Sequence, residues 1–183
     1  MTEVARSVSQ QSAFRSAKCD HPFIRGASGG SGVGMAAVDV SVTSDLSPER
    51  AWKLASDLRR FDEWLTIFGG WKGEVPAEIE VGTCVSSLIK VKGFRNTIHW
   101  RVTRYDEPKA IELVGRGRPA ICIALRLCVK ETSPGPSSSA SGSVFQVTAD
   151  LTGGLLNTRV GNLVAKVLES DVRKSVTNLA ALR

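Results

Sequence analysis

Long apolar runs are missing from this sequence. No stretch approaches the roughly 20 consecutive apolar residues that a membrane-spanning helix needs, and no hydrophobic segment typical of a signal peptide stands at the N-terminus. The chain has 183 residues, a length that suits one domain, and 42% of them are hydrophobic. We therefore expect a cytoplasmic domain with its own core and without a membrane span.

Histidine and cysteine are also scarce, at two and four residues. No pair of them has the spacing of zinc ligands, and without an export signal the thiols are expected to be free. Cys122 and Cys128 fall on one expected strand about 20 Å apart, too far to bond to each other. No nucleophile elbow, Ser/His/Asp set or phosphate-binding loop is present. The sequence predicts no metal and no cofactor, and it favours a binding protein over an enzyme.

Charge gives a weak signal. The formal net charge is +6, with an isoelectric point near 9.4, but Lys and Arg are scattered among Asp and Glu without a dense run. A nucleic-acid partner is therefore not indicated.

The first 34 residues differ in composition from the rest. Ser, Gly, Ala, Gln and Arg dominate residues 1–34, and residues 26–34 have the composition of a flexible linker. Residues 32–37 match G-x-G-x-x-A, but the dinucleotide-binding motif needs a strand before it and a helix after it. Here a disordered run is expected before the match and a strand after it, so we do not interpret it as a dinucleotide site. We predict a disordered tail over residues 1–34 and one folded domain over residues 35–183.

The stretch 155–182 is expected to form one long helix with an apolar stripe. The stripe consists of Leu156, Val160, Leu163, Val164, Val167, Leu168, Val172, Val176, Leu179 and Leu182. Such a helix must be covered, and the chain before it has strand patterns. Alternation predicts strands at 38–43, 83–92, 95–105, 110–115, 120–130 and 143–151. This is an α+β layout, a sheet packed against a C-terminal helix.

Two short helices are expected after the first strand. Ser47 is a favourable N-cap followed by Pro48, and Asp57 can cap a second helix that Gly69 and Gly70 end.

Alternation also assigns the faces of the sheet. Ile98 and Trp100 share one face, whereas His99 and Arg101 share the other. The face toward the helix is then apolar, so we predict a cavity for an apolar small molecule between sheet and helix. Its predicted lining is Trp64, Ile89, Ile98, Trp100, Leu113, Ile123, Phe145, Val160 and Val164. No catalytic residue is assigned, and an enzyme would need an inward polar group, with Asp171 or Arg104 as first candidates.

Short runs within the domain carry a resemblance. They are Asp57-Leu58, Glu63-Trp64-Leu65-Thr66, Pro76, Glu78-Ile79, Gly82-Thr83, Val91-Lys92-Gly93, Asn96, Ile98, Trp100 and Arg104-Tyr105. With the order of elements, they resemble the START-like (SRPBCC, helix-grip) superfamily of polyketide cyclases and lipid-transport proteins. Within it, the chain is similar to an actinobacterial branch that contains a mycobacterial toxin of a type II toxin–antitoxin pair.

The resemblance implies a curved antiparallel sheet that grips the long C-terminal helix around an apolar cavity. The ligand implied is a lipid, a polyketide or a similar molecule, and an antitoxin protein is the implied protein partner. The alternative is an enzyme similar to a polyketide cyclase or dehydratase that acts on a hydrophobic substrate.

Overall fold

The computed structural model describes residues 35–92, 94–133, 141–153 and 159–182, with the side chains of residues 35 and 159–165 excepted. The tail expected over residues 1–34 lies outside the described residues. The beginning of the expected C-terminal helix, residues 155–158, lies outside them as well.

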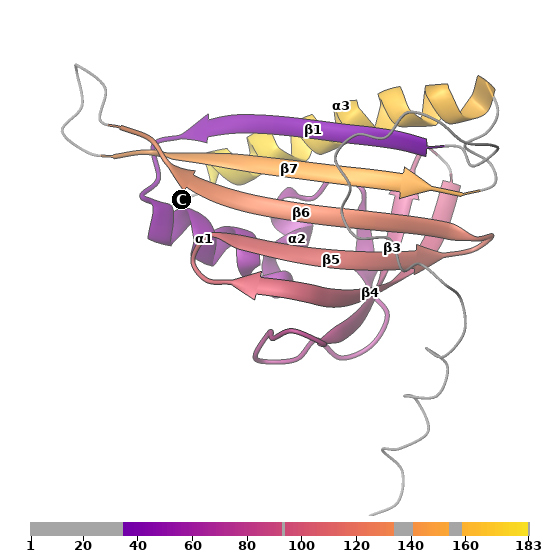
Figure 1. The fold of residues 1–183 in the computed structure, drawn as a ribbon, viewed down its shortest axis with the longest axis horizontal. Coiled ribbons are helices and arrows are strands. Elements are labelled where there is room, and N and C mark those ends of the chain that lie inside the picture. The colour runs from indigo at the N-terminus through magenta and orange to yellow at the C-terminus, as the bar shows by residue number, and fades with distance from the viewer. Residues whose placement is uncertain (1–34, 93, 134–140, 154–158, 183) are drawn as a thin grey trace, which may run out of the picture. The chain divides into compact units, whose positions relative to one another are not determined.

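The described strands form one antiparallel seven-stranded sheet in the order β1-β7-β6-β5-β4-β3-β2 (Figure 1). The strands are β1 (Met35–Ser44), β2 (Phe68–Trp71), β3 (Cys84–Val91), β4 (Phe94–Asp106), β5 (Ala110–Gly117), β6 (Ile121–Glu131) and β7 (Ser143–Thr152). Six of the seven match strands that the alternation predicts, with ends shifted by no more than about three residues.

Burial follows the two-residue period of the strands. In β7, Phe145, Val147 and Ala149 are buried, whereas Gln146 and Thr148 between them are only half-buried. The same alternation places Ile98 and Trp100 of β4 inside and leaves His99 exposed. The predicted assignment of His99 to the outer face is therefore confirmed.

The short helices begin where the caps predict. α1 (Pro48–Ser56) starts after Ser47, whose hydroxyl accepts a hydrogen bond from the Arg50 backbone N–H at 3.4 Å. The 3-10 turn η2 (Leu58–Arg60) starts after Asp57, whose carboxylate accepts from the Arg59 N–H at 3.0 Å. It continues into α2 (Phe61–Trp64).

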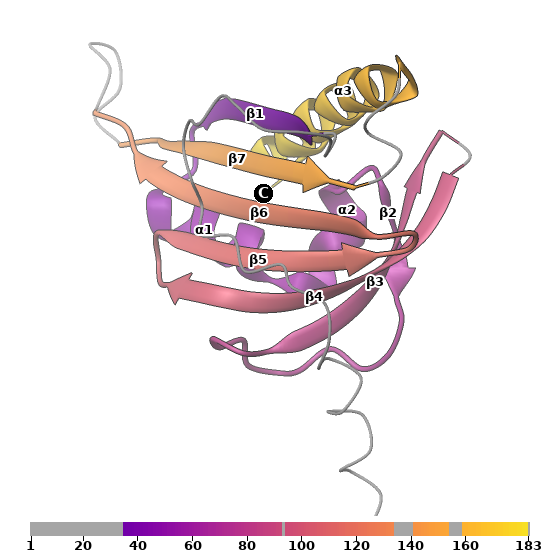
Figure 2. The same ribbon diagram turned by 45° about the vertical axis from the view of Figure 1, so that its right-hand side comes forward.

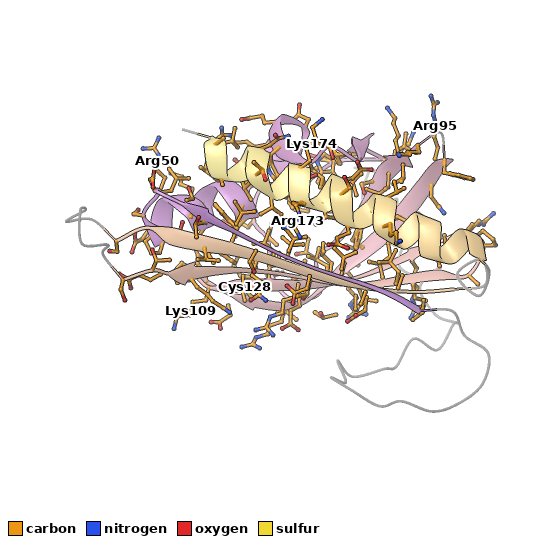
Figure 3. The ribbon with its side chains drawn as sticks, turned by 90° about the horizontal axis from the view of Figure 1, so that it is seen from above. Arg50, Arg95, Lys109, Cys128, Arg173 and Lys174 are labelled. Atoms are coloured by element: carbon orange, nitrogen blue, oxygen red, sulfur yellow. The ribbon has the colours of Figure 1, made fainter. Side chains whose placement is uncertain are left out.

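The long helix α3 (Arg159–Ala181) packs chiefly along β1 (Figure 1). Leu168, Val176 and Leu179 are buried in the core, and the Ser44 hydroxyl donates to the Ala180 carbonyl at 3.0 Å. All three α-helices lie on one side of the sheet, and Lys109 extends from the other side (Figure 3). The predicted α+β architecture, a sheet around a C-terminal helix, is confirmed.

Two expectations are wrong. Gly69 and Gly70 do not end a helix, because α2 stops at Trp64 and the two glycines belong to β2, paired with β3. Cys122 is disulfide-bonded, so not all thiols are free, although Cys84 and Cys128 are. Spacing along the chain cannot reveal a bond that depends on the fold. Within the described part of the chain, no helix is long and apolar enough to cross a membrane.

Candidate functional site

The concave face of the sheet, which faces the helices, is built around Trp100. The cross-strand register places Trp100 of β4 opposite Val85 on one side and Gly115 on the other, and Gly115 opposite Ile123 of β6. A Cβ atom at Gly115 would lie 2.5 Å from Trp100 Cζ3 and 2.7 Å from Ile98 Cγ2. The absence of a side chain at Gly115 therefore lets the indole of Trp100 lie against the sheet.

A buried hydrogen bond fixes the indole. Trp100 Nε1 donates to Ser87 Oγ at 2.9 Å, and Ser87 is only 2% exposed. The hydroxyl stands on the concave face because Ser87 is two residues from Val85 in the same strand. An indole whose N–H is satisfied leaves its apolar rings for packing.

Apolar side chains near Trp100 are incompletely covered. The buried core divides into a larger cluster beneath α1 and α3 and a smaller cluster of Leu58, Val85, Ile98 and Trp100. Between them, Leu113 and Leu125 contact both clusters but stay half-buried. They stand on β5 and β6, which have neighbouring strands on both sides. The incomplete cover therefore lies on an inner face and not at a sheet edge.

Seven of the nine predicted lining residues belong to these two clusters or pack against them. Trp64 and Phe145 belong to the larger cluster, whereas Ile98 and Trp100 belong to the smaller one, and Ile89, Leu113 and Ile123 pack half-buried against the smaller cluster. Val160 and Val164 belong to the part of α3 whose side chains are not described. Their common contact with a ligand stays a prediction.

The indole of Trp64 has an unsatisfied donor. Trp64 is 5% exposed, and its Nε1 has no hydrogen-bond acceptor among the described residues. Its backbone is held to α3, because Asn178 Nδ2 donates to the Trp64 carbonyl at 3.4 Å and the Thr66 N–H donates to Ser175 Oγ at 3.0 Å. Since a buried donor without an acceptor costs about 1–3 kcal/mol, an acceptor on a bound molecule would stabilise this site.

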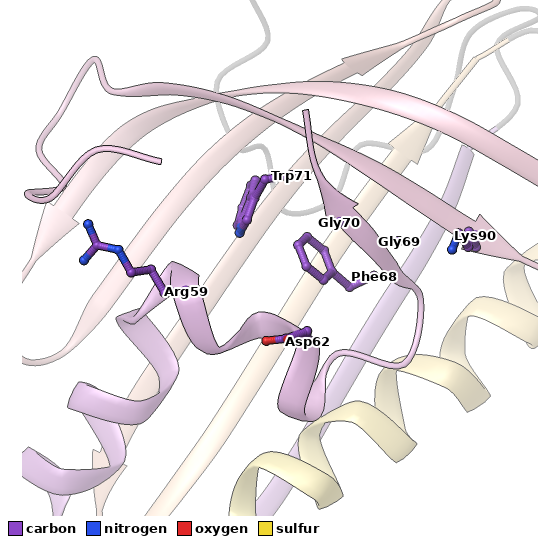
Figure 4. Close-up of a pocket in the computed structure, with 7 residues that line it drawn as sticks. All are labelled: Arg59, Asp62, Phe68, Gly69, Gly70, Trp71 and Lys90. Atoms are coloured by element: carbon purple, nitrogen blue, oxygen red, sulfur yellow. The ribbon is translucent and has the colours of Figure 1, made fainter. Parts of the chain in front are cut away.

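A hollow of about 380 Å³ lies at the edge of the sheet, where β2 meets η2 and α2 (Figure 4). It is lined by Arg59, Asp62, Phe68, Gly69, Gly70, Trp71 and Lys90. The rings of Phe68 and Trp71 lie 5.1 Å apart, and Trp71 Nε1 donates to the Leu58 carbonyl at 3.0 Å. The residues of this hollow are not among the predicted site residues, because Gly69 and Gly70 resemble a helix end in the sequence, although the flanking Phe68 and Trp71 are typical of a strand.

A second hollow, of about 410 Å³, lies on the outer face, with Arg104, Arg126 and Cys128 in its lining. Arg104 is exposed and lies 3.3 Å from the Asp106 carboxylate and 3.6 Å from that of Glu112. Arg104 therefore does not serve as an inward catalytic group, and the other candidate, Asp171, is half-buried on α3. Neither hollow is lined by the residues predicted for the apolar cavity.

A bulge explains the position of Arg104. The register between β4 and β5 shifts between Val102 and Arg104, so that Arg104 pairs with Glu112 and Tyr105 pairs with Ile111. One extra residue exchanges the faces of all later side chains. Tyr105 thus turns inward, 5.7 Å from the ring of Trp52, and burial raises the pKa of its phenol above the ordinary value of 10.0.

His99 is remote from the concave face. Its Nδ1 lies 2.8 Å from Ser86 Oγ, and both residues stand on the outer side of their strands. His99 therefore lies on the face of β4 opposite Trp100, as the alternation predicts.

The chain is similar to a described protein family and to a mycobacterial protein. Residues 35–182 match the family model described as polyketide cyclase / dehydrase and lipid transport. A relative from Mycobacterium tuberculosis H37Rv, named Toxin Rv0910, is 36% identical over 148 residues, which cover 81% of this chain and 98% of that protein.

Two solved structures share the fold. A START superfamily protein from Mycobacterium smegmatis has a TM-score of 0.60 at 17% identity, with 80% of this chain and 95% of that chain covered. The Zhui aromatase/cyclase from Streptomyces sp. R1128 has a TM-score of 0.61 at 14% identity, with 80% and 92% covered. The START-like fold predicted from the sequence is thereby confirmed.

Proposed function

The chain belongs to the polyketide cyclase / dehydrase and lipid transport family, and from this premise we propose that it binds an apolar small molecule between the concave face of the sheet and α3. A lipid, a polyketide or a molecule of similar polarity fits the chemistry of that face. The proposed role is binding, with no covalent step assigned to any residue.

The half-buried apolar side chains on the inner strands carry this proposal. Leu113, Ile123 and Leu125 stand on β5 and β6, where complete packing would bury them fully, yet each stays partly exposed. Covering apolar surface is worth roughly 25 cal/mol per Å². A ligand that covers these side chains therefore gains affinity without any charged contact.

Two polar groups are available to orient such a ligand. The Trp64 N–H is buried without an acceptor among the described residues, and the Ser87 hydroxyl, which accepts from Trp100, retains its own proton to donate. A mainly apolar molecule with one or two oxygen acceptors suits this arrangement.

A neutral fluorescent probe, N-phenyl-1-naphthylamine, tests the proposal. Its emission should rise on binding, and tryptophan emission should fall through energy transfer, since Trp64 and Trp100 are in the predicted lining. Leu113→Phe fills the half-covered space. The probe should then bind about tenfold more weakly, because it loses apolar contact area of roughly one aromatic ring.

Val114→Phe is the matched control, because Val114 is the next residue of β5 and faces the opposite side of the sheet. It should leave probe affinity within about twofold. Failure of the unmodified protein to bind the probe, or equal losses in both variants, would contradict the proposal.

A second candidate role is that of a toxin whose activity a partner protein restrains. The observation that favours it is the 36% identity to the protein named Toxin Rv0910. Controlled expression in a mycobacterial host should then stop growth, and co-expression of a small protein encoded beside it should restore growth. Unchanged growth at high expression would count against this role. The enzyme alternative, similar to a cyclase or dehydratase, would be favoured by turnover of a polyketide substrate that Ser87→Ala abolishes.

A further inference from the structure

The tip of the β3–β4 hairpin extends beyond its neighbouring strands (Figure 2). We define the tip as Lys90, Val91, Lys92, Phe94 and Arg95. The pairing of β5 with β4 begins only at His99, and the pairing of β2 with β3 reaches only to Ile89. Beyond Lys90, whose N–H donates to the Ile67 carbonyl at 2.8 Å, no described strand pairs with either arm of the tip. Val91 is half-buried against the larger core cluster, whereas Lys92, Phe94 and Arg95 are exposed and can meet a partner.

Phe94 is the most exposed large hydrophobic side chain of the described residues, at 72%. Two-residue alternation puts it on the same face of β4 as Ile98 and Trp100, and its cross-strand partner is Val91. Asn96 interrupts this face of β4, but Ile89 and Val91 of the neighbouring β3 extend the apolar surface outward to the uncovered phenyl ring.

Exposed cations lie close to Phe94 along the hairpin, with Lys90 and Arg95 paired on the face opposite its ring. Lys90, Lys92 and Arg95 are exposed, and Figure 3 shows Arg95 pointing away from the sheet. Arg118, also exposed, is held beside β4 because its N–H donates to Asn96 Oδ1 at 3.3 Å and its carbonyl accepts from Asn96 Nδ2. The sequence from Thr83 to Tyr105 contains no Asp or Glu, and Lys90 shares the lining of the hollow beside β2 with Asp62.

We infer that this tip docks the protein onto an anionic lipid surface, with Phe94 inserted at the headgroup boundary and the cations at the phosphates. An exposed aromatic side chain amid Lys and Arg matches the requirements of interfacial binding, in which apolar burial and attraction to anionic lipids add. A protein partner would need roughly 800 Å² of matching surface on each side, which five residues of a projecting tip do not provide. Docking here would place the apolar rim of the concave face against the bilayer.

The test is sedimentation of the full chain with vesicles of phosphatidylcholine alone or with 30% phosphatidylglycerol added. The protein should bind the anionic vesicles, bind neutral vesicles much more weakly, and dissociate as salt is raised. Phe94→Ser should weaken binding about tenfold or more, on the scale of one buried aromatic side chain.

The charge variant is Lys92→Asn with Arg95→Gln. Asn suits residue 92, whose φ is 39°, because it tolerates the left-handed region. If each cation contributes about fivefold to the affinity for anionic vesicles, the double variant should bind them about 25-fold more weakly.

Matched controls remove the same chemistry elsewhere. Val81→Ser removes the other exposed large hydrophobic side chain, 61% exposed, and Lys53→Gln with Lys174→Gln removes two exposed cations from α1 and α3. Both controls should bind anionic vesicles within about twofold of the unmodified protein.

The inference is overturned if the unmodified protein does not bind anionic vesicles, or if the tip variants bind as well as their controls. It is also overturned if the tip variants lose affinity for a co-purifying protein while vesicle binding stays unchanged. These vesicle measurements need no apolar probe. Vesicle binding without probe binding would therefore refute the proposed ligand site and would not affect the inference that the tip docks onto lipid.

Discussion

Gly115→Ala tests the central arrangement of the concave face. A Cβ atom at residue 115 would lie 2.5 and 2.6 Å from Trp100 Cζ3 and Cε3, distances that no relaxed contact allows. These two atoms cannot move separately from the rest of the side chain, because both belong to the rigid indole ring. Trp100 is also only 9% exposed, so the ring has little space around it. The ring must move away, and the hydrogen bond from Trp100 Nε1 to Ser87 Oγ, 2.9 Å long, is lost with the movement.

The size of the effect follows from three contributions. Overpacking a buried site costs about 1–3 kcal/mol, and the lost hydrogen bond adds about 1 kcal/mol. Replacing glycine restricts the unfolded chain and offsets about 0.4–1 kcal/mol. The net loss in the free energy of unfolding is then roughly 1–3.5 kcal/mol, or about 3–10 °C in melting temperature for a domain of this size.

Thermal unfolding followed by circular dichroism measures this loss, with Gly69→Ala as control. At residue 69 a new Cβ would lie 2.7 Å from Lys90 Cε, near the end of a flexible side chain that can move away, and 3.0 Å from the Leu88 carbonyl oxygen. That backbone contact is tight but longer than both contacts with the Trp100 ring, so Gly69→Ala should cost less. Gly115→Ala should also cost less in a Trp100→Leu background, because the clashing ring is gone. Equal melting temperatures for Gly115→Ala and Gly69→Ala, or an unchanged cost in the Trp100→Leu background, would refute the reasoning.

Three further outcomes are expected. His99→Gln, on the outer face, should leave probe binding within about twofold, since exposed substitutions usually change stability by less than about 0.5 kcal/mol; a larger loss without unfolding would revive a role for the imidazole. Ser47→Ala should lower the free energy of unfolding by about 0.5–2 kcal/mol in a denaturant titration, because the cap of α1 is lost, and Ser133→Ala serves as an exposed control. Tyr105, the one tyrosine of the chain, should ionise above pH 10.0 in the folded protein and near it in denaturant, as seen by absorbance at 295 nm. Because its folded pKa is raised, its contribution to stability should be complete below pH 10 and decline as pH rises toward the folded pKa, a decline that Tyr105→Phe should remove.

Much of the fold could be predicted because its signals are local. Alternation in Phe145, Val147 and Ala149 identifies β7 and its buried face, and Ser47 with Pro48 marks the start of α1. The same period correctly separates Trp100 from His99. The predicted ligand contacts of the concave face are a different matter, since they depend on how closely α3 approaches the sheet.

The sequence by itself determined the elements, their order and the apolar face of each strand, because side-chain period and capping act over a few neighbouring residues. The tertiary structure alone decided where those rules are modified. The indole of Trp100 packs against Gly115 only when β4 and β5 pair. Strand β2 forms only when its backbone pairs with β3. The bulge after Val102 turns Arg104 outward and Tyr105 inward. These features rest on contacts between residues distant in the chain, whose free energy exists only in the assembled sheet.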